Sequence, residues 1–178
     1  LVWNILPMAI LGICVGWITA SIVSDKIVGL LVGIIALLFV LQHVVLKQNK
    51  NSKISLETST RAGHFWGLIT GFTSFIAHAG GPPFQIYAMP LRLDPKVFTS
   101  SSVLIFSVLN FLKIGPYLAL GRLNLNLTWS ALTLMPVAIC ATLLGAAIVK
   151  KMNAEIFYPI MYGFLTLVAL RLIFVSML

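Results

Sequence analysis

Residues 71–87 read G-F-T-S-F-I-A-H-A-G-G-P-P-F-Q-I-Y, an apolar stretch interrupted in its middle by two glycines and two prolines. Proline has no backbone N–H and glycine disfavours helix, so no continuous helix can pass through residues 79–83. In lipid, each backbone group freed by such a break is costly unless protein or a water-filled cavity receives it. The interruption therefore predicts a broken helix that lines a site.

The composition of the chain places this broken helix in a membrane. Of 178 residues, 60% are hydrophobic and only 9% are charged, whereas a soluble domain has about 25% charged residues. The net charge of +8 does not indicate nucleic-acid binding, because most Lys and Arg residues lie between hydrophobic blocks, where they set membrane orientation. We therefore expect an all-α integral membrane protein, built as a polytopic helical bundle.

Hydrophobic blocks define the expected organisation. Residues 1–46 hold two spans, at about 2–23 and 27–46, and form the end of a first module; residues 47–62 form a polar loop. Residues 63–178 form a second module, with the broken segment at 63–94 and intact spans at about 97–120, 127–149 and 156–178. Each intact span has the roughly 20 residues that cross about 30 Å of hydrocarbon.

An internal repeat supports the two modules. Residues 6–20 resemble residues 135–149, and four positions are identical at one constant offset. These pairs are Pro7 and Pro136, Ala9 and Ala138, Ile10 and Ile139, and Gly16 and Gly145. A duplication explains this pattern better than chance among apolar helices. The first copy then lacks the broken segment and the span after it, so we expect the chain to be part of a larger protein.

Three motifs carry a resemblance to a known family. The run at 71–87, the K-V-F at 96–98 and the N-F-L-K-I-G-P-Y-L-A-L-G-R-L at 110–123 resemble the TauE/SafE sulfite exporter and toluene-sulfonate uptake permease family. The resemblance covers nearly the whole chain. It implies a transporter of the bacterial inner membrane, with two duplicated modules and sulfite, sulfonates or other organic anions as cargo.

Loop charges decide between two topologies. The Lys-rich loop at 47–62 is expected in the cytoplasm. If the broken segment crosses the membrane, the ten loop Lys and Arg residues divide evenly between the two sides. If it turns back as a re-entrant hairpin, eight of the ten lie in the cytoplasm, and only Lys26 and Arg122 lie outside. The hairpin is therefore favoured, and it gives the two modules the inverted orientation known in many transporters.

The tip of this hairpin is the expected binding site. A second half-helix beginning near Pro82 would point the free N–H groups of residues 84–86 toward the break, and a helix N-terminus attracts anions. Gly80 and Gly81 would let a ligand approach bare backbone. His78 could donate a hydrogen bond or carry a proton, although helix packing also accounts for a lone His in a membrane. Two further polar residues of the half-helix, Gln85 and Tyr87, are candidates for the same site.

Asn110 and Lys113 share one face of the span at 97–120, because they are three residues apart. Lys113 is about two thirds of the way across the span, where an ionisable group is expensive. Its side chain either extends toward the far interface or serves as a counter-charge for the anion. The second interpretation also gives Asn110 a role, and Tyr117 continues the same face.

The sequence thus predicts a secondary transporter of small anions; the alternative is an anion channel or a non-transporting membrane scaffold on the same fold. An enzyme is not expected, because Asp25, Glu57, Asp94 and Glu155 lie in loops or at span ends and form no acid–base pair. No nucleotide-binding loop or metal-ligand spacing is present, so no cofactor is expected. The expected partners are the anion, the lipid bilayer and a coupling proton; homo-oligomerisation is left open.

Overall fold

The structure is a computed structural model that describes residues 1–48, 59–121 and 125–178, and its regular elements over these ranges are all helical. The helices are α1 (Val2–Thr19), α2 (Asp25–Gln48), α3 (Thr60–Ile76), α4 (Gly81–Ala88), the short 3-10 helix η1 (Met89–Leu91), α5 (Pro95–Ala119), α6 (Leu125–Lys151) and α7 (Ala154–Met177). Five of them, α1, α2, α5, α6 and α7, are long and apolar enough to cross a membrane. The expected all-α polytopic bundle is confirmed.

The observed boundaries agree with the hydrophobic blocks to about one helical turn. The predicted break at 79–83 is present, because α3 ends at Ile76 and α4 begins at Gly81. The helix α5 begins at Pro95, whose lack of an N–H costs nothing in the first turn, and Asp94 caps it by accepting a hydrogen bond from the Lys96 N–H at 2.8 Å. Most of the predicted loop at 47–62 lies outside the described residues, as does Arg122.

Helices α1 and α3 pack in parallel with their backbones in contact. Three glycines of α3, Gly63, Gly67 and Gly71, recur every fourth residue and therefore lie on one face. A methyl group placed on Gly67 would lie 2.5 Å from the Ile5 carbonyl oxygen, and one on Gly71 would overlap the Ala9 carbonyl oxygen. Small residues at such spacing allow close helix approach in membranes.

Helices α2 and α7 pack in antiparallel directions. A methyl group on Gly29 would lie 3.0 Å from Ser176 Oγ. Further along α2, the His43 ring stacks on the Tyr162 ring with the centroids 3.9 Å apart. Gly29 precedes His43 in α2, whereas its partner Ser176 follows Tyr162 in α7. The two helices therefore run in opposite directions.

The broken segment folds back on itself as a hairpin. A methyl group on Gly80 would lie 2.6 Å from Ser74 Cβ, at the end of α3. A methyl group on Gly63, near the start of α3, would lie 2.9 Å from Tyr87 Oη, near the end of α4. The return limb α4 therefore runs back along α3.

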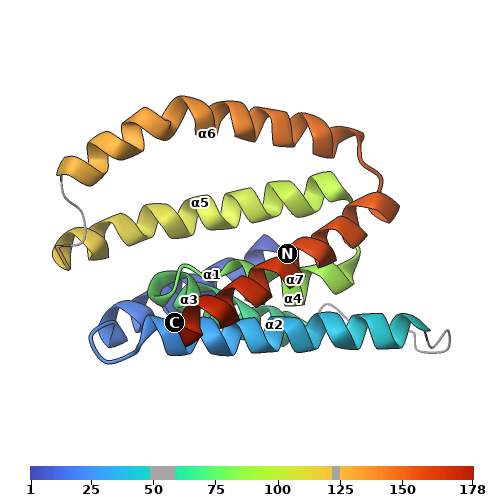
Figure 1. Cartoon of the computed structure of the whole chain (residues 1–178), viewed down its shortest axis with the longest axis horizontal. Coiled ribbons are helices and arrows are strands. Elements are labelled where there is room, and N and C mark those ends of the chain that lie inside the picture. The colour runs from blue at the N-terminus through green and yellow to red at the C-terminus, as the bar shows by residue number, and fades with distance from the viewer. Residues whose placement is uncertain (49–58, 122–124) are drawn as a thin grey trace.

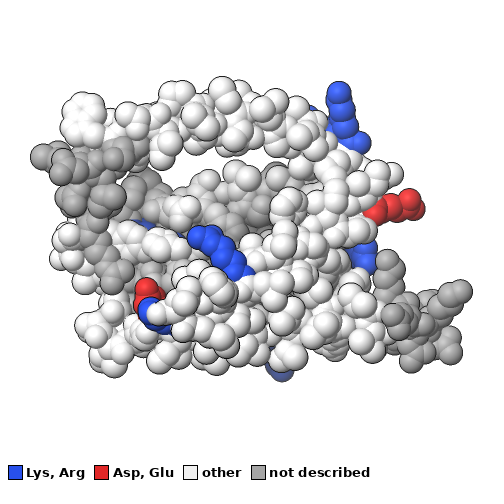
Figure 2. All heavy atoms as spheres, viewed as in Figure 1, with Lys and Arg blue, Asp and Glu red and all other residues white. Residues whose placement is uncertain are grey.

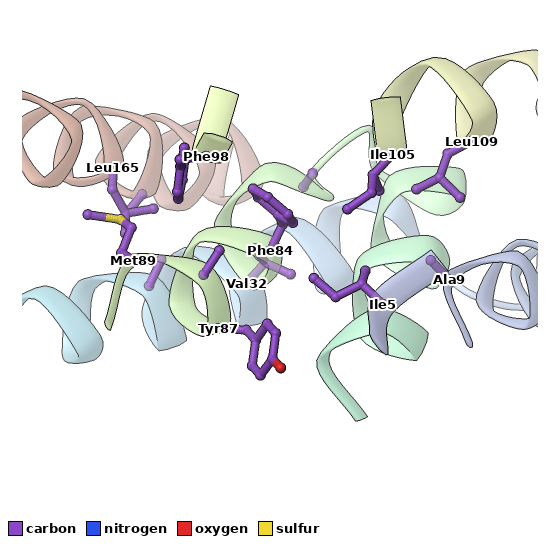
Figure 3. Packing of buried hydrophobic residues seen from close by; sticks show 14 of the residues in the cluster. Ile5, Ala9, Val32, Phe84, Tyr87, Met89, Phe98, Ile105, Leu109 and Leu165 are labelled. Carbon is purple, nitrogen blue, oxygen red and sulfur yellow. The ribbon is translucent and has the colours of Figure 1, made fainter. Parts of the chain in front are cut away.

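The centre of the bundle is occupied by α4. Phe84 lies at the centre of the apolar cluster, near Phe98 of α5 (Figure 3), with their ring centroids 5.7 Å apart. Most of α4 is buried, including both prolines. The return limb of the hairpin thus faces protein rather than lipid along most of its length.

Helix α6 stands apart from this bundle. Figure 1 shows it at the top of the molecule, and in the space-filling view an open gap separates much of it from the atoms below (Figure 2). Every residue from Ala131 to Ile148 is exposed. The face seen in Figure 2 is mostly uncharged, with Lys, Arg, Asp and Glu side chains few and scattered.

Candidate functional site

The hairpin tip consists of the end of α3, a four-residue connection and the start of α4. The N–H groups of Ala77 and Ala79 both donate to the Thr73 carbonyl oxygen, at 3.0 and 3.1 Å, which closes the last turn of α3. His78 then turns the chain in the left-handed conformation, with φ of 52°. This conformation is uncommon for residues other than glycine, so the tip holds a strained backbone position.

The carbonyl groups at the end of α3 receive their hydrogen bonds from α5. Lys113 Nζ donates to the Ser74 carbonyl oxygen at 2.7 Å and to Ser74 Oγ at 2.6 Å. Tyr117, one turn further along α5, donates its hydroxyl to the Phe75 carbonyl oxygen at 2.9 Å. The last carbonyls of a helix have no partner within the helix. Here Lys113 and Tyr117 of α5 supply the hydrogen-bond donors that water would supply outside a membrane.

Lys113 is a buried cation with a full set of acceptors. Its side chain is only 4% exposed, and Asn110 Oδ1 lies 3.4 Å from Nζ as a third acceptor. An ammonium group has three donors, and the C-terminal end of α3 carries partial negative charge that favours a cation there. Lys113 therefore does not extend toward the far interface, and the expected shared face of Asn110, Lys113 and Tyr117 is directed at the hairpin tip.

His78 lies on the exposed side of the same cluster. Its Nε2 atom is 3.5 Å from the Tyr117 hydroxyl oxygen, and the two rings meet edge to face with their centroids 5.9 Å apart. Tyr117 thus joins His78 to the Lys113 group. Among the predicted residues, the structure brings His78, Asn110 and Lys113 together at the tip.

The start of α4 differs from the predicted one. The helix begins at Gly81, and the Phe84 N–H already donates to the Gly80 carbonyl oxygen at 3.3 Å. The prediction that the Phe84 N–H is free is therefore wrong, and residues 85 and 86 lie deeper in the helix. Since Pro82 and Pro83 have no N–H, the donors of this terminus reduce to the Gly80 and Gly81 amides.

The two glycines have different surroundings. A methyl group on Gly80 would lie 2.6 Å from Ser74 Cβ and 2.8 Å from the Thr70 carbonyl oxygen, so Gly80 permits close packing of the two limbs. A methyl group on Gly81 would meet nothing within 4 Å. The backbone at Gly81 therefore borders open space.

Gln85 and Tyr87 lie along the return limb, away from the connection. The Tyr87 hydroxyl is near Gly63, which is thirteen residues before the end of α3, or roughly 20 Å along the helix. The structure therefore separates Tyr87 from the Lys113 group. Within the described ranges, Gln85 Oε1, Tyr87 Oη and Thr70 Oγ1 are buried oxygen atoms without a hydrogen-bond partner.

A cavity adjoins the end of α3. It has a volume of about 200 Å³ and lies between the α1–α2 turn and the last residues of α3. Its lining consists of Ala20, Val23, Ser24, Asp25, Phe75 and Ile76. Because Phe75 carries the carbonyl that Tyr117 caps, this cavity adjoins the hairpin tip.

Two features of the structure were not singled out in the sequence. The glycines of α3 follow a G-x-x-x-G-x-x-x-G pattern from Gly63 to Gly71, which is a recognisable signal for helix packing in membranes. Arg171 is exposed within the span formed by α7, and an ionisable residue inside a span marks a candidate for function. Arg171 could have been found in the sequence as a lone charged residue in an apolar run.

The fold and the tip define a multi-pass membrane protein in which a broken helix is held by a buried cation. The family model described as "Sulfite exporter TauE/SafE" matches residues 1–172. The chain belongs to this family, as its motifs indicate. The family is one of membrane transporters rather than enzymes. No curated protein and no solved structure matches the chain.

Proposed function

We propose that the chain is a secondary transporter of small anions, with sulfite, sulfonates or related anions as cargo, in a bacterial inner membrane. The observation that carries this proposal is the buried Lys113 at the break of a membrane-embedded helix. A cation is rare and expensive at such a depth, and intramembrane cations commonly mark the path of a substrate. Family membership supports membrane transport of anions in general.

The tip offers an anion two kinds of donor. Gly81 presents open backbone at the start of α4, where the helix dipole favours negative charge. Lys113 supplies an ammonium group whose contact with Asn110 Oδ1, at 3.4 Å, is longer than its two contacts with Ser74. In this proposal an anion replaces Asn110 Oδ1 as the third hydrogen-bond acceptor of the Lys113 ammonium group. The two hydrogen bonds to Ser74 keep Lys113 in place.

His78 supplies the group for proton coupling. It lies on the exposed side of the tip and contacts Tyr117, and histidine changes its protonation near neutral pH. In the proposal, His78 takes up a proton together with the anion.

The direction of α7 supports a re-entrant tip. Two spanning helices, α5 and α6, lie between α2 and α7 in the chain. If the broken segment crossed the membrane as well, α2 and α7 would run in the same direction. Their antiparallel contacts, from Gly29 with Ser176 to His43 with Tyr162, favour a segment that enters and leaves on one side.

Uptake by the full chain in proteoliposomes tests the proposal. Radiolabelled sulfite, with taurine in parallel, is expected to accumulate above its external concentration, and an uncoupler is expected to abolish the accumulation. The Lys113→Met variant should lose uptake, whereas Lys96→Met, at the start of α5, should keep it. Flux that only equilibrates the anion would identify a channel, and absence of flux for both solutes would contradict transport of this cargo.

A further inference from the structure

Two buried hydroxyl groups lack the hydrogen bonds that comparable groups in this bundle make. Thr70 is 0% exposed and Tyr87 is 6% exposed, and neither hydroxyl has a partner among the residues that the structure describes. Other threonines donate to the carbonyl oxygen four residues earlier at 2.7–2.9 Å, namely Thr19, Thr73, Thr142 and Thr166. The tyrosines Tyr117 and Tyr158 also donate to carbonyl oxygens. An unpartnered buried hydroxyl costs stability and therefore needs an explanation.

The two hydroxyls follow one face of α3 that begins at the hairpin tip. Thr70 is four residues before Ser74, and its carbonyl oxygen lies 2.8 Å from the position of a methyl group on Gly80. The Tyr87 hydroxyl lies 2.9 Å from the position of a methyl group on Gly63, which is seven residues before Thr70. Residues four and seven apart share a helix face, so this line is roughly 16 Å long.

Asn4 of α1 lies at the far end of this line. A methyl group on Gly63 would lie 2.7 Å from Asn4 Cβ as well as 2.9 Å from Tyr87 Oη, so these two side chains are neighbours. Asn4 is half-buried, and Gly63 is in the first turn of α3, next to the polar loop at 47–62. Polar side chains thus lead from the Lys113 group toward the loop. We call Ser74, Thr70, Tyr87 and Asn4 the polar track.

We propose that the anion moves along the polar track between the hairpin tip and the loop at 47–62, in a second conformation in which α4 moves away from α3. This inference rests on the proposed function and adds a route to it. The Thr and Tyr hydroxyls and the Asn amide can each donate a hydrogen bond to an oxyanion, and none of them is charged. A path must bind its solute weakly enough to release it, which neutral donors do better than a second ammonium group would.

Removing the two hydroxyls separates this role from a role in packing. Because they have no partners to lose, Thr70→Val and Tyr87→Phe should each raise the melting temperature in detergent. Each should also reduce sulfite uptake into proteoliposomes by at least about tenfold, since a hydrogen bond to the moving anion is lost. The matched control is Thr166→Val on α7, whose hydroxyl donates to the Tyr162 carbonyl oxygen at 2.9 Å. It should lower the melting temperature and keep uptake.

Thiol labelling tests the track without relying on transport. Thr70 and Ala36 are both 0% exposed, so Thr70→Cys and Ala36→Cys are compared in the full chain carrying Cys14→Ser and Cys140→Ser. A charged, water-soluble thiol reagent should modify Thr70→Cys in proteoliposomes and leave Ala36→Cys unmodified over the same time, because only the track opens to water.

The outcomes distinguish the track from the transport proposal. If the unsubstituted chain transports sulfite and both hydroxyl variants transport it equally well, the track is overturned and the transport proposal stands. Lower melting temperatures for both variants would give the hydroxyls a packing role and also overturn the track. If the unsubstituted chain transports neither sulfite nor taurine, the transport proposal fails, and labelling alone decides whether the track opens. Equal labelling of Thr70→Cys and Ala36→Cys would then overturn it.

Discussion

Lys113 on α5 donates two hydrogen bonds to Ser74, one to its carbonyl oxygen at 2.7 Å and one to its hydroxyl oxygen at 2.6 Å. Residues far apart in the sequence are thereby joined at the point where α3 ends. A helix that stops inside a membrane leaves carbonyl groups that lipid cannot satisfy. The same ammonium group both completes the fold at this point and provides the charge that the proposed anion requires.

Replacing Lys113 by Met tests these two roles together. The methionine fills similar space but leaves the Ser74 carbonyl and hydroxyl unpaired, and an unpaired buried group costs about 1–3 kcal/mol. We expect Lys113→Met to lower the melting temperature in detergent and to reduce sulfite uptake by at least about tenfold, since about 1.4 kcal/mol of lost binding is tenfold. Unchanged uptake by a folded Lys113→Met protein would remove Lys113 from the site.

Tyr117→Phe isolates the second cap. The change removes the hydrogen bond to the Phe75 carbonyl oxygen and should destabilise the protein by about 1–2 kcal/mol. Tyr158→Phe is the matched control, because the Tyr158 hydroxyl donates to the Leu93 carbonyl oxygen at 2.8 Å. Thermal melts should show similar losses for both variants, but only Tyr117→Phe should reduce uptake. Equal uptake by the two variants would indicate that Tyr117 has a structural role alone.

Substitutions of His78 separate backbone strain from chemistry. Because His78 has a positive φ, His78→Gly should stabilise the protein by about 1 kcal/mol, the cost of the left-handed conformation for a residue with a side chain. His78→Asn should keep the turn, since Asn tolerates this conformation, but it cannot carry a proton. Both variants are expected to lose the dependence of uptake on a pH gradient. If both keep that dependence, His78 is not the coupling group.

Glycine-to-alanine changes test the backbone contact of α1 with α3. The methyl group of Gly71→Ala would overlap the Ala9 carbonyl oxygen, so the helices must separate, at a cost of about 1–3 kcal/mol or more. Gly145→Ala on α6 meets open space and should be neutral or stabilising by up to about 1 kcal/mol through helix propensity. The melting temperatures of the Gly71→Ala and Gly145→Ala proteins in detergent measure these two effects on stability. Equal stability of the two variants would show that the parallel contact is not formed.

Much of the fold could be predicted from the sequence, because hydrophobic blocks of span length and a Gly–Gly–Pro–Pro break are local signals. The shared helix face of Asn110 and Lys113 could also be predicted, because it follows from the spacing of the two residues along one helix. The acceptor at Ser74 could not be predicted, because it depends on how α5 docks against the end of α3. The number of free amides at the tip was predicted wrongly, since the start of α4 at Gly81 depends on the tight packing of Gly80 against Ser74.

The capping of α3 by α5 also constrains how the chain is made. Residues 71–87 leave the ribosome before Lys113 and Tyr117 do, so the broken segment first meets the bilayer with its carbonyls unsatisfied. It has no stable place in lipid until α5 arrives. Insertion of the hairpin and of α5 is therefore a single coupled event during biogenesis, and the break must be sheltered from lipid until that event occurs.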